Sequence, residues 1–197
     1  MKILYSIILA AILLPGTSYG MLNTRDTRTE LSRSQIESTN PVLDFELNIE
    51  LELSRFEGRS LRPFVAVWVE NEKSESVRTL ALWYNNNRWL PDLKRWYAKH
   101  FEKLQKPVFT DAVSGATRSA GKYTIKWDMK DDSGNTVEPG KYTVYIEAVR
   151  ERGTYQLINR EIELNEDPKR IELEGGIEIA SAFIEYVKLS PEITSSR

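Results

Sequence analysis

Hydrophobic and polar residues alternate along the segment that begins at Leu43. Apolar side chains occupy every second position from Leu43 to Leu53, and Asp, Glu and Asn occupy the positions between them. Successive side chains of a strand point to opposite faces, so this alternation predicts a strand with one buried and one acidic face. Further segments of strand-like composition follow at residues 64–69, 77–84, 123–127, 142–149, 155–164 and 177–189. Together they predict a mainly β protein with an antiparallel sandwich fold.

One pair of these segments carries a clear hairpin signature. Asp132-Ser133-Gly134-Asn135 is typical of a turn, and Pro139-Gly140 precedes the returning strand. The order of Trp-Asp, acidic Gly turn, Pro-Gly and Tyr-Thr resembles the Ig-like module of flagellar hook-capping proteins, which implies an Ig-like sandwich. Asp128, Asp131 and Asp132 could be read as calcium ligands, but their spacing is not that of a known calcium loop. It favours ordinary turn acids.

Residues 91–106 interrupt the strand pattern with a helical period. Asp92 is placed to cap a helix over 92–104. One side would carry Leu93, Trp96, Tyr97, Phe101 and Leu104, and the other Lys94, Arg95, Lys99 and Lys103. The pattern predicts an amphipathic helical insertion that packs on the sandwich. Basic residues among aromatic ones can bind nucleic acid, but in this weakly acidic chain a packed helix with a solvated basic face is favoured.

The N-terminal segment predicts export from the cytoplasm. Its apolar run, residues 3–14, is 12 residues long, and a Pro-Gly pair and the small residues Ser18 and Gly20 follow it. This is typical of a signal peptide over residues 1–20, since the run is too short to span a bilayer. The polar residues 21–42 then predict a flexible leader, residues 43–190 the sandwich domain, and residues 191–197 a polar tail.

Composition narrows the chemistry that the chain can perform. The chain has no Cys, a single His at position 100 and a formal net charge of −2 at pH 7. Disulfides, Fe–S clusters, thiolate zinc sites and a lipid carried on Cys are therefore excluded. One His also makes a His-based metal site or a Ser-His-Asp triad improbable. We expect a soluble periplasmic protein that is not an enzyme, binds no metal and has no general attraction for nucleic acid.

The segment Asp111-Ala112-Val113-Ser114-Gly115-Ala116-Thr117 consists mostly of small residues. Another protein's active site could close around such a loop, and glycine permits backbone geometries that are barred to other residues. The Thr117 hydroxyl could attack a phosphate if a partner enzyme supplied the metal and the activated leaving group. Asp111 could orient that hydroxyl or help to neutralise the metal. An exposed surface turn is the alternative interpretation.

The same segment, Asp111-x-x-Ser114-Gly115-Ala116-Thr117, resembles the flavinylation motif of the FMN-binding subunits of the sodium-pumping NADH:quinone reductase and its Rnf relatives. The resemblance implies that a flavin transferase moves FMN from FAD to Thr117 and leaves a phosphoester bond. Asp111, Ser114, Gly115 and Ala116 would form the loop that the transferase recognises. Many such motifs have a further Ser or Thr three residues past the attachment point, where this chain has Ala120.

A second resemblance covers most of the sandwich domain. The segments that carry it are residues 62–70, 77–83, 90–93, 111–118, 121–124 and 153–156. Their order and spacing are similar to those of the domain-of-unknown-function family 2271, a group of predicted periplasmic proteins. This resemblance implies a flavinylated carrier that works beside a flavin transferase and a PepSY-type membrane protein.

Two function hypotheses result. The first is a periplasmic electron-transfer protein with FMN bound covalently to Thr117. The second is a non-catalytic β-sandwich binding or assembly module of the cell envelope. For the first, stacking partners for the flavin ring would come from Trp83, Tyr84, Trp89, Trp96 and Tyr97, although core packing is favoured for each of them. The cations that could balance the FMN phosphate are Arg88, Arg118 and Lys122.

Overall fold

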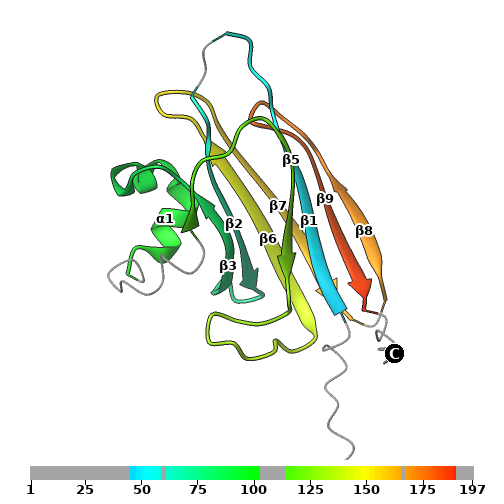
Figure 1. Ribbon diagram of the computed structural model, residues 1–197. Helices are drawn as coiled ribbons and strands as arrows, with labels where there is room; N and C mark the ends of the chain where they lie inside the picture. The colour runs from blue at the N-terminus through cyan, green and yellow to red at the C-terminus, as the bar shows by residue number, and fades with distance from the viewer. Residues whose placement is uncertain (1–44, 59–60, 103–113, 166, 190–197) are drawn as a thin grey trace, which may run out of the picture. The chain divides into compact units, whose positions relative to one another are not determined.

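The computed structural model describes residues 45–58, 61–102, 114–165 and 167–189, which form a β-sandwich with one short helix (Figure 1). Sheet A has the strand order β5-β1-β9-β8, and sheet B has the order β4-β3-β2-β6-β7. The strands are β1 (Phe45–Leu53), β2 (Phe64–Asn71), β3 (Ser76–Trp83), β4 (Ser114–Gly115), β5 (Gly121–Trp127), β6 (Gly140–Val149), β7 (Tyr155–Leu164), β8 (Lys169–Leu173) and β9 (Ile179–Lys188). The predicted mainly β sandwich is confirmed.

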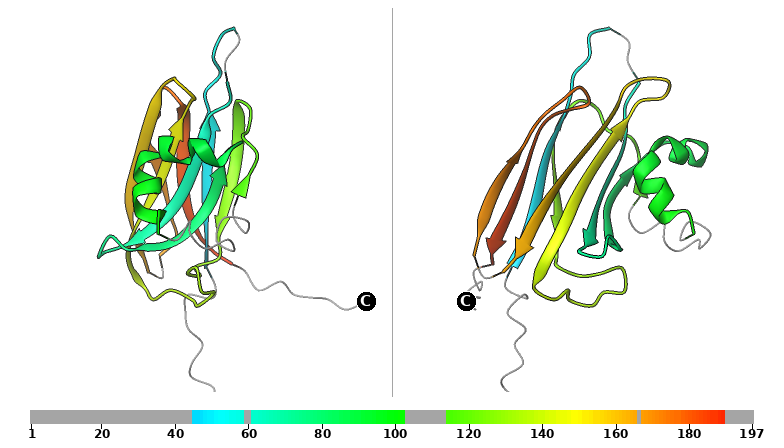
Figure 2. Two further views of the ribbon diagram at one scale, coloured as in Figure 1. Left: turned by 90° about the vertical axis from the view of Figure 1, so that its left-hand side faces the viewer. Right: turned by 180° about the vertical axis from the view of Figure 1, so that it is seen from behind.

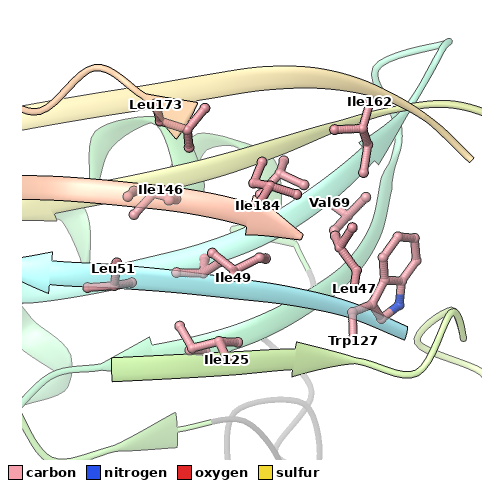
Figure 3. Close-up of a cluster of buried hydrophobic side chains, with 14 of the residues drawn as sticks. Leu47, Ile49, Leu51, Val69, Ile125, Trp127, Ile146, Ile162, Leu173 and Ile184 are labelled. Carbon is pink, nitrogen blue, oxygen red and sulfur yellow. The ribbon is translucent and has the colours of Figure 1, made fainter. Parts of the chain in front are cut away.

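The alternation in β1 places its apolar side chains between the two sheets. Every second residue from Phe45 to Leu53 is buried, and the polar residues between them face the other side of sheet A. Figure 3 shows Leu47, Ile49 and Leu51 of β1 among apolar side chains from both sheets. Fully burying one such side chain stabilises the fold by about 1.5–3 kcal/mol. The period-2 pattern thus determines which face of sheet A forms the core.

Strand β2 is buried on both faces, unlike β1. Val65, Val67 and Val69 point into the core between the sheets, while Ala66 and Trp68 belong to a second apolar cluster on the outer face of sheet B. This second cluster forms because a 3₁₀ helix, η2 (Asn87–Asp92), and the helix α1 (Lys94–His100) cover that face (Figure 2). A strand covered on both sides needs a continuous apolar run, and residues 64–69 supply one.

The cap of helix α1 differs from the sequence prediction. Asp92 ends η2, the N-cap position of α1 is Leu93, and no side chain caps the helix from that position. The backbone N–H groups of Arg95 and Trp96 instead donate to the carboxylate of Glu147 on β6, at 2.9 and 2.8 Å. A carboxylate at a helix N-terminus satisfies donors that lack an intrahelical partner. The prediction of Asp92 as the cap is therefore wrong, because a non-local acid takes that role.

Two strands were not predicted. β8 forms an edge of sheet A, and the two-residue β4 pairs with β3 in parallel, so the sandwich is not antiparallel throughout. α1 is shorter than predicted and ends at His100. The predicted signal peptide, leader and polar tail all lie outside the described residues, as do Leu104 and Asp111.

Candidate functional site

Two residues of the small-residue motif form part of sheet B. Ser114 and Gly115 are β4, and they pair with Leu82 and Trp83 at the end of β3. The backbone N–H of Tyr84 donates to the carbonyl of Gly115 at 2.9 Å. Ala116 and Thr117, the last two motif residues, therefore lie at a defined place, directly after a strand that is anchored to the sheet edge. Asp111 precedes the described part of the motif, so its predicted role stays a prediction.

Gly115 does not use the conformational freedom of glycine. It is not among the glycines with a positive φ, and a Cβ added to it would lie 3.6 Å from Cδ1 of Trp83, an ordinary van der Waals contact. Folding of this chain therefore does not explain why position 115 is glycine.

Thr117 lies on the connection that leads from β4 of sheet B to β5 of sheet A. Figure 1 shows this connection, residues 116–120, crossing the end of the sandwich. Ala116 is exposed and Thr117 half-buried, and the guanidinium of Arg62 donates to the Thr117 carbonyl at 3.5 Å. Further along, the hydroxyl of Tyr123 donates to the Ser119 carbonyl at 2.7 Å. The motif threonine is thus presented on a surface connection whose backbone is tied down on both sides.

A cleft opens beside the motif, between the edges of the two sheets. It has a volume of about 550 Å³, within the range of small-molecule sites. We call it the edge cleft. Its lining consists of Glu46, Arg78, Thr79, Leu80, Ala81, Trp83, Ser114, Gly115, Arg118, Thr124, Ile125, Lys126 and Asp128. Two of the predicted site residues, Ser114 and Gly115, therefore form part of its wall.

Charges in the edge cleft are mostly paired. Glu46 lies 2.8 Å from Lys126, and Asp128 lies 3.7 Å from Arg78. Arg118 has instead an aromatic partner, since its guanidinium carbon is 4.8 Å from the ring centroid of Trp83 and 5.4 Å from that of Tyr123. Such contacts leave the positive charge available to a ligand in the cleft.

A second, smaller cleft of about 270 Å³ adjoins the other side of the motif connection. We call it the arginine cleft, because Arg55, Arg62 and Arg150 line it together with Ser119 and Ala120. Arg150 is ion-paired with Glu178 at 2.9 Å. Within the described residues, no carboxylate pairs with Arg55 or Arg62. Residues of the motif and of the connection that follows it thus line two clefts, and each cleft contains an arginine that has no acidic partner among the described residues.

The aromatic residues that were predicted as alternative ring contacts separate into two groups. Trp83 lines the edge cleft, whereas Trp96 is fully buried in the cluster under α1. Tyr84, Trp89 and Tyr97 are partly buried and pack against that same cluster. Core packing is therefore the role of the four residues outside the cleft. Only Trp83 is both close to the motif and part of a cleft wall.

The three cations that were predicted to balance the FMN phosphate lie in different places. Arg118 lies in the edge cleft, but Arg88 stacks on Trp89 at 4.3 Å, and Lys122 lines a different, small cleft on sheet A. Arg62 was not predicted, since it is separated from Thr117 by 55 positions in the sequence. No local pattern could have found it, because the two residues meet only when the sheets pack.

The basic face of α1 is not simply solvated. Arg95 and Lys99 lie 3.3 and 3.6 Å from Glu70, a carboxylate that is almost fully buried on β2. Burial raises the pKa of Glu147, the acid that caps the helix, although its bonds to the helix backbone oppose this change. Burial together with a hydrogen bond to Glu147 raises the pKa of Tyr155 as well. These groups attach the helix to the sheet, which gives them a structural explanation.

The acids of the β5–β6 turn also have a structural role. Asp131 accepts hydrogen bonds from the backbone N–H groups of Ser133 and Asn135, at 2.8 and 2.9 Å. Hydrogen bonding, first of all from the Asn135 backbone, lowers the pKa of Asp131. In the ranges that the structure describes, no group of three or more His, Cys, Asp or Glu side chains is arranged to hold a metal ion. Nor does any helix in those ranges have the length and apolar character needed to cross a membrane.

The fold and the site describe a β-sandwich protein that presents a small-residue threonine motif between two clefts. The chain belongs to the DUF2271 family of predicted periplasmic proteins, whose family model matches residues 45–181. This match confirms the family resemblance and assigns the protein to the periplasm. No curated protein and no solved structure shows significant similarity to the chain.

Proposed function

We propose that the protein is a periplasmic electron-transfer protein that carries FMN in a phosphoester bond to Thr117. The observation that carries this proposal is the setting of the motif. Thr117 lies on a surface connection that is anchored by β4; the guanidinium of Arg62 donates to its carbonyl, and Arg118 follows it in the chain. A phosphodiester has a negative charge, which nearby guanidinium groups stabilise. The donor set around Thr117 therefore fits the phosphate of the attached group.

The attachment needs a partner enzyme and FAD. The Thr117 Oγ attacks the phosphorus of the FMN half of FAD, and a new P–O bond forms. The bond between the two phosphates breaks, AMP leaves, and the hydroxyl proton passes to a base of the flavin transferase. A metal ion in the transferase would neutralise the leaving phosphate. The reaction involves no change in oxidation state, so it needs no oxidant or reductant.

The small residues support access by the transferase. Gly115 is glycine although the fold would accept a Cβ there, and Ala116 is exposed. Both properties agree with a loop around which another active site closes. The absence of larger side chains would then serve the enzyme that modifies the loop.

An attached flavin would give this chain redox chemistry that its own side chains do not supply, and we therefore propose electron transfer as its role. With no Cys, it can form neither a disulfide nor an Fe–S cluster. A bound flavin supplies one- and two-electron chemistry, and a covalent bond keeps it on the protein in the periplasm. The protein would then carry electrons without catalysing a reaction of its own. The family resemblance suggests a flavin transferase and a PepSY-type membrane redox protein as its partners.

Intact mass measurement tests the attachment. We expect that the wild-type protein, co-expressed with a flavin transferase, gains an FMN-sized mass and retains yellow colour after denaturation. Thr117→Ala should abolish both signals, while Thr117→Ser, which keeps a hydroxyl, should retain them. Ser119→Ala is the matched control, because it removes another hydroxyl from the same connection and should leave the mass increase unchanged.

Two results would contradict the proposal. One is an FMN-sized mass increase that persists at full yield in Thr117→Ala. The other is no increase in the wild type while the same transferase modifies another substrate. The first result would place the attachment at another residue, and the second would favour the alternative, in which the sandwich is a non-catalytic binding or assembly module of the cell envelope.

A further inference from the structure

The edge cleft has features that attachment at Thr117 does not require. A covalent bond alone would keep a flavin on the protein, with its ring free in solvent. The chain nevertheless forms a cleft of about 550 Å³ whose wall includes the motif residues Ser114 and Gly115. Most of the residues that line the cleft come from β3 and β4 on one side and from β5 on the other. A cleft of this size, next to the motif, is large enough to bind a small-molecule ligand.

Arg118, a cation of the cleft wall, is held against two aromatic rings. Trp83 and Tyr123 pack edge to face, with ring centroids 5.2 Å apart, and Arg118 lies over both rings. Trp83 is only 6% exposed, whereas Arg118 is exposed, so the arginine lies on the solvent side of the rings. Aromatic faces and a planar guanidinium both stack well on a flat conjugated ring.

The charge in the cleft favours an electron-rich ring. Each of its two carboxylates, Glu46 and Asp128, is matched by a cation of the cleft wall. Arg118 has no carboxylate partner within the described residues. The described lining thus presents one unmatched positive charge next to Trp83. A cation in this place stabilises a ligand more strongly as the ligand becomes more negative.

The motif brings a group attached to Thr117 within reach of the edge cleft. Gly115 and Arg118 line the cleft, and Thr117 lies between them in the chain. Two residues of extended chain span at most about 7 Å, so Thr117 lies close to the cleft wall. A ribityl phosphate is long enough to bridge that distance. The phosphate can therefore remain near Arg62 while the ring enters the cleft.

We propose that the edge cleft is the binding site for the isoalloxazine ring of the flavin on Thr117, with the guanidinium of Arg118, which lies over Trp83, both as the stacking contact and as the charge that favours the reduced state. This inference rests on the proposed function for the attachment but assigns a second, separate site. Arg118 acts as a positioning and tuning residue. Its positive charge raises the reduction potential, because the reduced flavin carries more negative charge than the oxidised one.

The experiment compares the potential and the flavin fluorescence of FMN-loaded variants. Arg118→Gln should weaken the preference for the reduced flavin roughly tenfold, which lowers the potential of a two-electron couple by about 30 mV. It should also increase flavin fluorescence, since a ring held less firmly in the cleft beside Trp83 is less quenched. Arg118→Lys keeps the charge and should retain most of the potential. Arg160→Gln, an exposed arginine on β7, is the matched control and should change neither quantity.

The outcomes separate this inference from the proposed function. If FMN is attached but wild type and Arg118→Gln share one potential and one fluorescence yield, the ring lies elsewhere and the inference is wrong, while the attachment stands. If no FMN is attached, titration of Thr117→Ala with riboflavin tests the ring site by itself, because riboflavin has the same ring but no phosphate. Quenching of tryptophan fluorescence that weakens in the Thr117→Ala, Arg118→Gln double variant would support the ring site. Absence of riboflavin binding would overturn it.

Discussion

Glu147 is a residue whose role depends entirely on where the fold places it. It is a fully buried acid on β6, and its carboxylate accepts both N-terminal hydrogen bonds of α1. A buried acid of this kind is costly unless its partners are present. Here the partners are backbone N–H groups that would otherwise lack acceptors. One side chain thus connects the outer helix to the central strands of sheet B.

Removing this carboxylate should detach the helix. We expect Glu147→Ala to lower the free energy of unfolding by roughly 2–4 kcal/mol, because one buried and one partly buried N–H group lose their acceptor and a cavity forms. Chemical denaturation measures the change. Glu161→Ala is the control, since that acid is exposed and forms a surface ion pair with Lys141. Its effect should stay within about 1 kcal/mol. An equal, small effect of both substitutions would contradict the assigned role.

At the scale of elements, periodicity predicted the long strands and missed the short ones. β1 was predictable because its buried and polar residues alternate over the whole strand. β4 has two residues and exists because it pairs with β3, a strand more than 30 positions earlier in the sequence. In β8 only Leu173 is fully buried, so its apolar signal was weak. Elements that depend on non-local pairing leave little trace in local sequence.

The same reason explains how far the candidate site was predictable. The motif itself is a contiguous segment, and Arg118 is its direct neighbour, so both were found in the sequence. Arg62 and the cleft walls on β3 and β5 are brought to the motif only by the packing of two sheets. Asp92 illustrates the opposite error. A local capping rule predicted it as the N-cap, but Glu147, more than 50 positions away, accepts the hydrogen bonds of the N-terminal N–H groups of the helix.

A substitution in strand β4 can separate recognition of the motif by the flavin transferase from the stability of the fold. Gly115→Ala should change the free energy of unfolding by no more than about 1 kcal/mol, because the backbone there is ordinary and the new methyl group has room. It should nevertheless slow FMN transfer at least about tenfold, because small displacements of a reacting group are costly in catalysis. Intact mass after a timed reaction with the transferase measures the rate.

The matched control makes the same substitution at a different backbone geometry. Gly134 has a φ of +84°, so Gly134→Ala should destabilise the protein by about 1 kcal/mol or more. It lies in the β5–β6 turn and should leave the rate of FMN transfer unchanged. If Gly115→Ala were modified at the wild-type rate, the small residue at this position would not be needed for recognition.

For the whole molecule, the end of the sandwich next to the motif is held together by one buried ion pair. Arg150 follows β6 of sheet B, and Glu178 precedes β9 of sheet A. Their side chains lie 2.9 Å apart, and Arg150 also donates to the carbonyls of Ser54 and Leu61 in the β1–β2 connection. The guanidinium further stacks on Phe56. This arginine therefore joins both sheets and forms part of the arginine cleft beside the motif.

Breaking this pair should destabilise the molecule far more than breaking a surface pair. Arg150→Met leaves Glu178 buried without its cation and should lower the free energy of unfolding by about 3–5 kcal/mol. Arg170→Met is a close control, because Arg170 also combines an ion pair, with Glu185 at 3.3 Å, and stacking on an aromatic ring, but on the exposed face of sheet A. Its cost should stay near or below about 1 kcal/mol. Denaturant unfolding of both variants decides the matter, and similar losses would mean that the two sheets are held together at this end by apolar packing instead of by the ion pair.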